Sequence, residues 1–169
     1  ALIYAAALND YALSDLLIYF GADPSMTDKK GNTALMTAVT EGGLETSDVL
    51  LQNRCDPNEK DLKGNTPLMI AAQQGNSEMA GLLLEYGAGL DSTNQQHYTA
   101  LAHAIRTGQT DMARLLADSG ANIHHQINPK QNLYDLAVLQ GETAIAAELK
   151  KRGAGPSPSP DFSEIRLLW

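Results

Sequence analysis

The chain has 169 residues and a formal net charge of −8, and 43% of its residues are apolar while only 5% are aromatic. No apolar run approaches the roughly 20 residues that a membrane-spanning helix needs, so no membrane span is expected. The acidic balance disfavours a general nucleic-acid binder, because phosphate contacts need a basic face. The single cysteine, Cys55, has no partner for an intramolecular disulfide and is expected to be a small buried residue.

The sequence repeats itself every 33 residues: Thr33, Thr66 and Thr99 each stand in an Asp/Asn-x-x-x-x-Thr-Ala/Pro-Leu phrase. The same spacing produces an alanine column at Ala5, Ala38, Ala71, Ala104 and Ala137, and a leucine column at Leu17, Leu50, Leu83, Leu116 and Leu149. A period of this length is typical of a solenoid, in which stacked units bury a core that no unit can bury alone.

In chain order, the repeat predicts a half-unit followed by three regular units and a degenerate fifth, at residues 1–27, 28–60, 61–93, 94–126 and 127–154. In the third of these, a turn at Gly64 is followed by Thr66, a good helix N-cap, and by Pro67, which suits the first helical position. The first helix should end at Gly75, and a second helix should end at Gly87. Each unit is therefore predicted as two helices and a projecting finger.

Both ends depart from the regular body. The first unit carries more apolar side chains than one inter-repeat contact can bury, so we expect an upstream segment, a second copy or a partner to cover it. Residues 155–160, Gly-Pro-Ser-Pro-Ser-Pro, predict a stiff, extended linker. Residues 161–169 form a short apolar tail that either covers the last unit or docks into another protein's groove. The side chains available for that second contact are Phe162, Ile165, Leu168 and Trp169.

The 33-residue unit resembles the ankyrin repeat, through the phrase Asp61-x-x-Gly64-x-Thr66-Pro67-Leu68-x-x-Ala71-Ala72-x-x-Gly75 with Leu82-Leu83 and Gly87-Ala88. The resemblance covers about residues 1–154. It departs from the family pattern where Met36, Met69 and Ala102 replace the usual His, and where Asn132-Leu133-Tyr134 replaces Thr-Pro-Leu. It implies an all-α ankyrin-repeat solenoid of about five helix-turn-helix units with short β-hairpin-like fingers.

Motifs for catalysis, cofactors or metals are absent from the sequence: it has no Gly-rich phosphate loop, no His-Glu-x-x-His, no Cys-x-x-Cys and no Gly-x-Ser-x-Gly. The adjacent pair His124-His125 has no third ligand at a useful local spacing. His97 and His103 are expected to form hydrogen bonds or to contact a partner. We therefore expect no enzyme activity, no cofactor and no metal.

The resemblance implies that another protein binds the concave surface made by the finger tips and the exposed positions of the first helices. Lysines gather in or beside the fingers while many carboxylates fall on the second helices, which indicates either ordinary surface solvation or an acidic partner. Tyr98 and Arg106 are the favoured anchors, Tyr98 as a finger-tip residue not needed for packing, and Leu62 is an unusual apolar tip. The family pattern places the partner-binding positions at Lys29, Lys30, Asn32, Thr40, Glu41, Leu62, Lys63, Asn65, Gln73, Gln74, Gln95, Gln96, Tyr98, Arg106 and Thr107.

The predicted function is non-enzymatic recognition of one protein partner, with sequestration or inhibition of that partner as a hypothesis from shape alone. One alternative is a regulatory or targeting arm of a longer enzyme or channel. Another is a self-associating scaffold, a homodimer formed through the apolar first unit, although a monomer is the primary expectation. The expected location is cytoplasmic, with a periplasmic alternative if a signal peptide has been removed.

Overall fold

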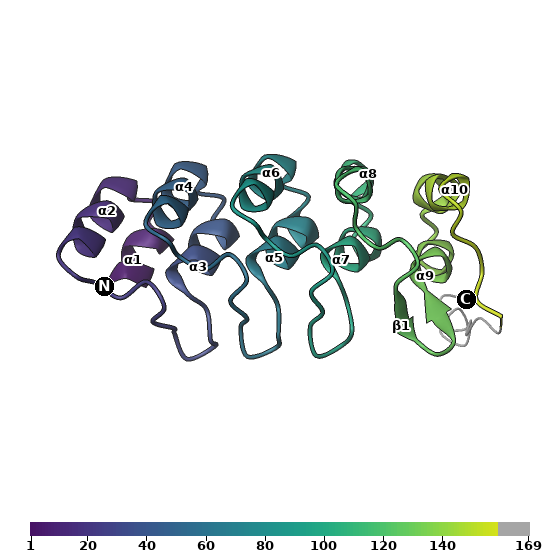
Figure 1. Ribbon diagram of the computed structural model, residues 1–169, viewed down its shortest axis with the longest axis horizontal. Helices are drawn as coiled ribbons and strands as arrows, with labels where there is room; N and C mark the ends of the chain where they lie inside the picture. Colours follow the sequence, from purple (N-terminus) through teal and green to yellow (C-terminus); the bar gives the residue numbers. More distant parts are fainter. Residues whose placement is uncertain (159–169) are drawn as a thin grey trace.

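The computed structural model describes residues 1–158, which form a single row of stacked helix pairs (Figure 1). Each pair has an inner helix beside the fingers and an outer helix behind it. The all-α repeat solenoid predicted from the sequence is confirmed, since these residues form ten helices and only one two-stranded sheet. The elements are α1 (Leu2–Ala7), α2 (Tyr11–Tyr19), α3 (Ala34–Thr40), α4 (Leu44–Gln52), α5 (Pro67–Gln74), α6 (Ser77–Glu85), α7 (Ala100–Arg106), α8 (Thr110–Asp118), β1 (Gln126–Asn128), β2 (Gln131–Asn132), α9 (Leu133–Leu139) and α10 (Thr143–Lys151).

The inner helices begin at the predicted N-caps. The hydroxyl oxygens of Thr33, Thr66 and Thr99 accept hydrogen bonds from the backbone N–H three residues later, at 3.2–3.4 Å. In α9 the cap is Asn132, whose side chain accepts from the N–H of Asp135 while the Asp135 carboxylate accepts from the N–H of Asn132. This reciprocal pair satisfies two donors that a helix start otherwise leaves unpaired. The degenerate last unit therefore begins its inner helix with a different type of N-cap.

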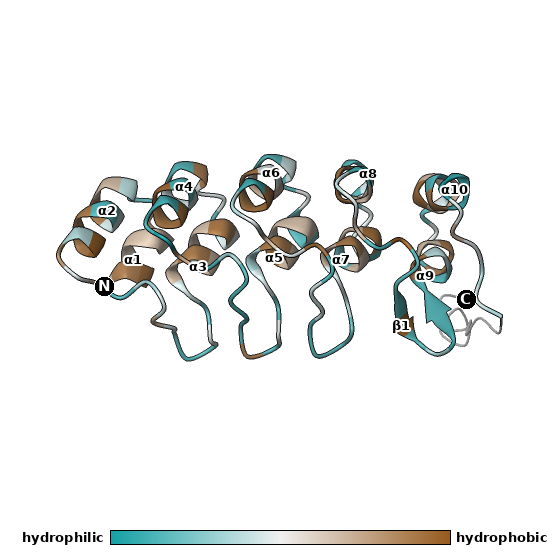
Figure 2. Ribbon diagram, viewed as in Figure 1, coloured by the Kyte–Doolittle hydropathy of each residue, from teal (hydrophilic) through white to brown (hydrophobic). Residues whose placement is uncertain are grey.

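The core lies between the inner and outer rows of helices. All five residues of the alanine column have no solvent exposure, and the leucine column is buried from Leu50 onward. Small residues let the inner helices approach closely, while the larger leucines fill the space behind them. In Figure 2 the apolar colour gathers on the helices and the fingers are largely hydrophilic.

Hairpin-like fingers were predicted for every unit, but only the last finger is a paired hairpin. There β1 and β2 are antiparallel, with Gln126 opposite Asn132 and an irregularity before Asn128. Each of the three preceding fingers is a tight turn closed by two backbone hydrogen bonds. The N–H of Asp28, Asp61 or Asn94 donates to the carbonyl four residues later at 2.9–3.1 Å, and the carbonyl of the same residue accepts from the N–H three residues later at 2.9–3.1 Å. None of these three fingers contains a β-strand.

The chain after α10 packs on the last unit. The Ser157 N–H donates to both carboxylate oxygens of Asp135 at 3.2 and 3.3 Å, and its hydroxyl donates to the Lys130 carbonyl at 2.9 Å. Asn132 Nδ2 donates to the Gly155 carbonyl at 2.8 Å. Residues 155–157, in the predicted linker, thus contact the last unit. The predicted tail at 161–169 lies outside the described residues.

No helix within residues 1–158 has the length and apolar character needed to cross a membrane.

Candidate functional site

An Asp or Asn side chain organises each of the first three fingers. Asp28 Oδ1 accepts from the backbone N–H of Lys30 at 2.7 Å and of Asn32 at 2.9 Å. The bond from the Asn32 backbone is the main reason that the pKa of Asp28 is lowered, so this carboxylate is charged when it shapes the turn. Asp61 repeats the arrangement with Lys63 and Asn65, and Asn94 repeats it with Gln96 and Tyr98. The exposed residues of each turn are therefore displayed on a fixed backbone.

Neighbouring fingers are joined by backbone hydrogen bonds. The N–H of Leu62 donates to the Lys30 carbonyl, and the N–H of Gln95 donates to the Lys63 carbonyl, both at 3.0 Å. Gly31 has φ +81°, and a Cβ placed on it would lie 2.7 Å from the Leu62 nitrogen. Glycine is thus required there twice over, for the left-handed backbone and for the close approach of the next finger. These links form a preordered surface.

The last two fingers are joined differently, through histidines. His97 occupies the glycine column of the fingers with φ +61°. Its carbonyl accepts a hydrogen bond of 2.7 Å from Nε2 of His125. This contact gives His125 a structural role in the array. No three of the His, Cys, Asp and Glu side chains in residues 1–158 are placed as metal ligands would be.

Several predicted partner-binding residues use their side chains to hold the array together. Gln74 Nε2 donates to the Thr40 carbonyl at 2.8 Å, and Gln95 Nε2 donates to the Leu62 carbonyl at 2.9 Å, so both link adjacent units. Internal side-chain hydrogen bonds are also formed by Asn32, Thr40, Asn65 and Thr107. These positions can offer a partner only part of their hydrogen-bonding capacity.

A second group of predicted residues is exposed, and among residues 1–158 their side chains form no hydrogen bond. Leu62 is the apolar member, with 67% of its surface exposed. These residues lie on the fingers and at the ends of the inner helices, so they are available to a binding protein. They are Lys29, Lys30, Glu41, Leu62, Lys63, Gln73 and Gln96.

Tyr98, predicted as a free finger tip, lies at the base of the third finger, where it is half-buried and packs against the core. Its ring centroid is 5.5 Å from that of His103, and the Arg106 guanidinium carbon lies 5.2 Å from the Tyr98 ring centroid. Tyr98 is not a free tip because the residue before the Thr99 N-cap must return to the body of the unit. Tyr98 therefore supports Arg106 through a cation–π contact.

His103 is held neutral at the centre of this cluster. It is only 4% exposed, and burial, reinforced by the nearby charge of Arg106, lowers its pKa to about 4. Asn94 Nδ2 lies 3.2 Å from its Nε2, and Arg106 Nη2 lies 3.1 Å from its Nδ1. The Asn94 orientation is set because its Oδ1 accepts from Gln96 and Tyr98. Both ring nitrogens thus face donors, and a neutral imidazole can accept from only one of them.

Asn94 is a site residue that sequence reasoning did not identify. Its amide nitrogen donates to Asn65 Oδ1 at 2.8 Å and also reaches His103, so it connects two fingers and an inner helix. The available signal was the change from Asp28 and Asp61 to Asn at the same position of the third finger. An amide, unlike an ionised carboxylate, can accept from its own turn and also donate to the neighbouring unit.

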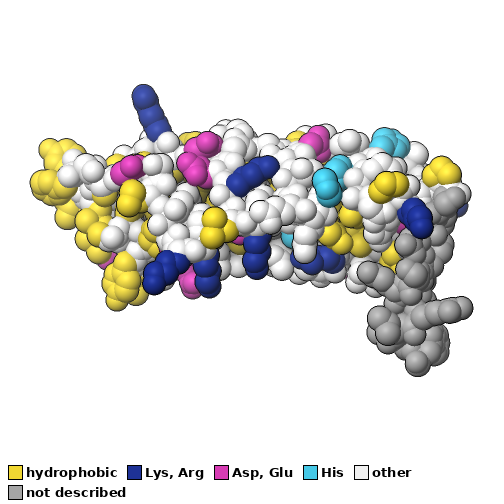
Figure 3. All heavy atoms as spheres, turned by 90° about the horizontal axis from the view of Figure 1, so that it is seen from below, with side chains coloured by type: hydrophobic (Ala, Val, Ile, Leu, Met, Phe, Trp, Pro, Cys, Tyr) yellow, Lys and Arg dark blue, Asp and Glu magenta, His cyan; other side chains and the backbone are white. Residues whose placement is uncertain are grey.

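Two hollows open on the finger side of the array. One, of about 430 Å³, lies between the second and third fingers, and its lining consists of Lys63, Asn65, Gln73, Asn94, Gln95, Gln96, His103 and Arg106. The other, of about 470 Å³, shares Lys63 and is otherwise lined by Lys29, Lys30, Asn32, Asp61 and Leu62. Figure 3, viewed from the finger side, shows several Lys and Arg side chains in a row along one edge of the fingers.

The sequence model described as "Ankyrin repeats (3 copies)" matches residues 2–94 and 44–127. The chain belongs to the ankyrin repeat family. Ankyrin repeats generally mediate protein–protein interactions and are typically non-enzymatic. A comparison with curated proteins finds no significant match.

The outer face of the ankyrin array has the opposite charge. A hollow of about 330 Å³ between α4 and α6 is lined by four carboxylates, those of Glu45, Asp48, Glu78 and Glu85. Lysines are absent from this lining, whereas they are present in both finger-side hollows. The lining of this hollow is therefore opposite in charge to the lysines of the finger-side hollows.

Proposed function

We propose that this chain is a non-enzymatic recognition module that binds one protein partner on the face formed by the first three fingers and the inner helices α3, α5 and α7. The observation that carries the proposal is the pair of hollows on a finger row whose backbones are hydrogen-bonded to one another. A preordered surface loses little conformational entropy on binding, which suits one-to-one capture. Occlusion of the partner's own site, and hence its inhibition, is part of this proposal.

Site-specific photo-crosslinking tests the proposed face. A photoreactive amino acid is introduced at Leu62 or Gln96 on the fingers and, as a matched control, at Glu78, an exposed position of the outer helix α6. After irradiation in the source cells, the finger positions should give the same adduct with one protein, and the outer position should give none. Adducts formed only at Glu78 would overturn the assignment of the face.

A second candidate interaction surface is the first helix pair, which we propose for self-association. Leu13 is 37% exposed, whereas its equivalents Met79, Met112 and Ile145 are at most 3% exposed. The helices that bear these equivalents each pack against the preceding outer helix, and α2 has no such neighbour within residues 1–158. Nearby, Tyr19 is 83% exposed. An apolar patch of this kind marks an interaction surface.

Sedimentation of the chain at several concentrations tests self-association. A dimer that dissociates in the Leu13→Glu variant is the expected result, because a charge at this position would be buried in the contact. A monomer at every concentration would exclude a homodimer through the first helix pair and leave the finger-side proposal unaffected.

A further inference from the structure

We infer that the hollow between the second and third fingers binds a carboxylate of an acidic segment in the partner protein. The inference rests on the proposed protein-binding face and specifies what that face recognises. Two cationic side chains from different units, Lys63 and Arg106, line this hollow, and no carboxylate is among its lining residues. On a chain whose net charge is −8, this local excess of positive charge is a feature of the site.

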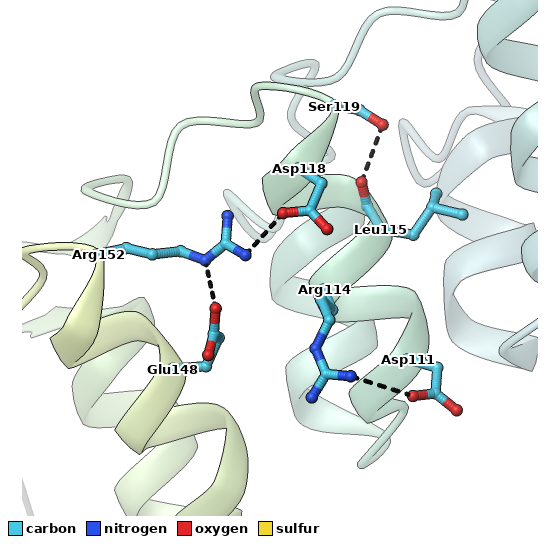
Figure 4. Close-up of polar contacts among 7 residues, drawn as sticks. All are labelled: Asp111, Arg114, Leu115, Asp118, Ser119, Glu148 and Arg152. Carbon is cyan, nitrogen blue, oxygen red and sulfur yellow. Dashed lines mark hydrogen bonds and ion pairs between the residues drawn. The ribbon is translucent and has the colours of Figure 1, made fainter.

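The two cations of the hollow have no ion-pair partner in the part of the chain that the structure describes, in contrast to Arg114 and Arg152. Arg152 Nη2 lies 2.7 Å from Asp118 Oδ1, and its Nε lies 2.8 Å from Glu148 Oε1 (Figure 4). Arg114 is paired with the carboxylate of its own helix that lies three residues earlier. Arg114 and Arg152 thus obtain their counter-charge within the described array, whereas Arg106 and the exposed Arg54 do not.

The hydrogen-bond donors of Arg106 are only partly satisfied. Its Nε is buried and makes no hydrogen bond to any described residue. Its Nη2 faces only Nδ1 of His103, a ring that must also face the amide of Asn94. Stacking on Tyr98 keeps the guanidinium half-buried at the edge of the hollow. A carboxylate is the group that best completes such a guanidinium, because it accepts two parallel hydrogen bonds and supplies the counter-charge.

The remaining lining of the hollow also suits a carboxylate. Gln73 and Gln96 have exposed side chains without hydrogen bonds among the described residues, and their amide N–H groups can donate to a carboxylate. His103 is uncharged near neutral pH and therefore neither attracts nor repels the ligand. The carboxylate of Asp61, on the second finger, accepts three hydrogen bonds from its own finger.

The neighbouring hollow extends the recognition to a segment of the partner. It shares Lys63 with the first and adds Lys29 and Lys30, so its lining holds three lysines against the one carboxylate of Asp61. Consecutive acidic side chains can therefore occupy both hollows. Leu62 stands in the same lining with two-thirds of its surface exposed. The segment recognised is thus acidic with an apolar residue beside the acidic ones, and charge complementarity accelerates its association.

The test uses a fluorescently labelled hexaglutamate peptide, with hexaglutamine as the uncharged control, and measures binding to the full chain by fluorescence anisotropy at low salt. Lys63→Gln with Arg106→Gln should weaken hexaglutamate binding about tenfold or more. The matched control is Lys150→Gln with Lys151→Gln, which removes the same two charges from exposed positions of α10. The control should bind within about twofold of the parent chain, since net charge alone acts weakly across the array.

Equal weakening in the two double variants, or equal binding of hexaglutamine, overturns the inference. If removing Arg106 disturbs the fold, Lys63→Gln alone keeps the experiment decisive because Lys63 is exposed. This single variant should weaken hexaglutamate binding about threefold. Inorganic phosphate at matched ionic strength should not displace the peptide; displacement would assign the site to a free anion. If the finger crosslinks form while hexaglutamate does not bind, only the acidic-segment inference fails, and the proposed function stands.

Discussion

Lowering the pH from about 7.5 to about 5 should destabilise the α7–α8 pair through His103. The pKa of this residue is lowered from 6.5 to about 4, first by burial and then by the charge of Arg106. Because the folded pKa lies below the unfolded one, the unfolded state takes up a proton first as the pH falls. The contribution of His103 is complete above about pH 6.5 and declines as the pH falls towards 4.

The size of the effect follows from the same two pKa values. One pKa unit corresponds to about 1.36 kcal/mol, so the free energy of unfolding should fall by about 3 kcal/mol in total below pH 4. About 2 kcal/mol of this loss should be reached at pH 5. Such a loss is a large fraction of the stability of a small domain. This loss of stability falls on the unit that carries Arg106 and hence on the candidate binding face.

The assay is urea unfolding of the parent chain and of His103→Gln at both pH values. Glutamine offers an acceptor oxygen and an NH2 donor group but does not titrate, so its variant retains the pH response of all other groups. Between the two pH values, the free energy of unfolding of the parent chain should fall by about 2 kcal/mol more than that of the variant. A difference below about 0.5 kcal/mol, or a His103 ring that titrates near 6.5 by NMR, would refute the reasoning.

Three further predictions concern the array itself. Gly31→Ala should lower the free energy of unfolding in urea by about 1–3 kcal/mol, because its Cβ would meet the Leu62 nitrogen at a left-handed backbone position. Gly21→Ala, at φ +88° in open space, is the control and should lower the free energy of unfolding by less. Cys55 is 6% exposed and burial raises its pKa to about 11, so a thiol reagent near pH 8 should label it only after unfolding, and rapid labelling of the folded chain would contradict this. Arg152→Gln should increase amide hydrogen exchange in α10 and leave α5 unchanged, because the carboxylates it joins lie on α8 and α10; unchanged exchange in α10 would show that these ion pairs do not stabilise the end of the array.

Local chemistry explains why much of the fold could be predicted. A threonine followed by a helix-forming run specifies an N-cap through bonds within three residues, and all three predicted threonine caps form. The alanine column could be assigned to a buried contact because the same contact recurs in every unit. The finger backbones followed the prediction only in part, since the first three fingers are closed as turns and only the last forms the β1–β2 pair.

The candidate site was less predictable because its roles depend on neighbouring units. Gln74 and Gln95 appeared as free polar residues, yet each reaches a carbonyl in the preceding unit. Tyr98 appeared as an exposed anchor, yet it lies against His103 and Arg106. The contacts of Gln74 and Gln95 join two units, and those of Tyr98 join the finger of one unit to its own inner helix. A family pattern projected residue by residue could therefore not distinguish linking side chains from free ones.

By itself, the sequence determined the period, the helix pairs, the caps and the buried columns, because each depends on interactions within one unit or on a contact repeated identically between units. Only the tertiary structure decided which finger residues remain available, how His103 is kept neutral, and that Lys63 and Arg106 face one hollow. These features arise where side chains from successive units meet, and their geometry depends on the stacking of the whole array.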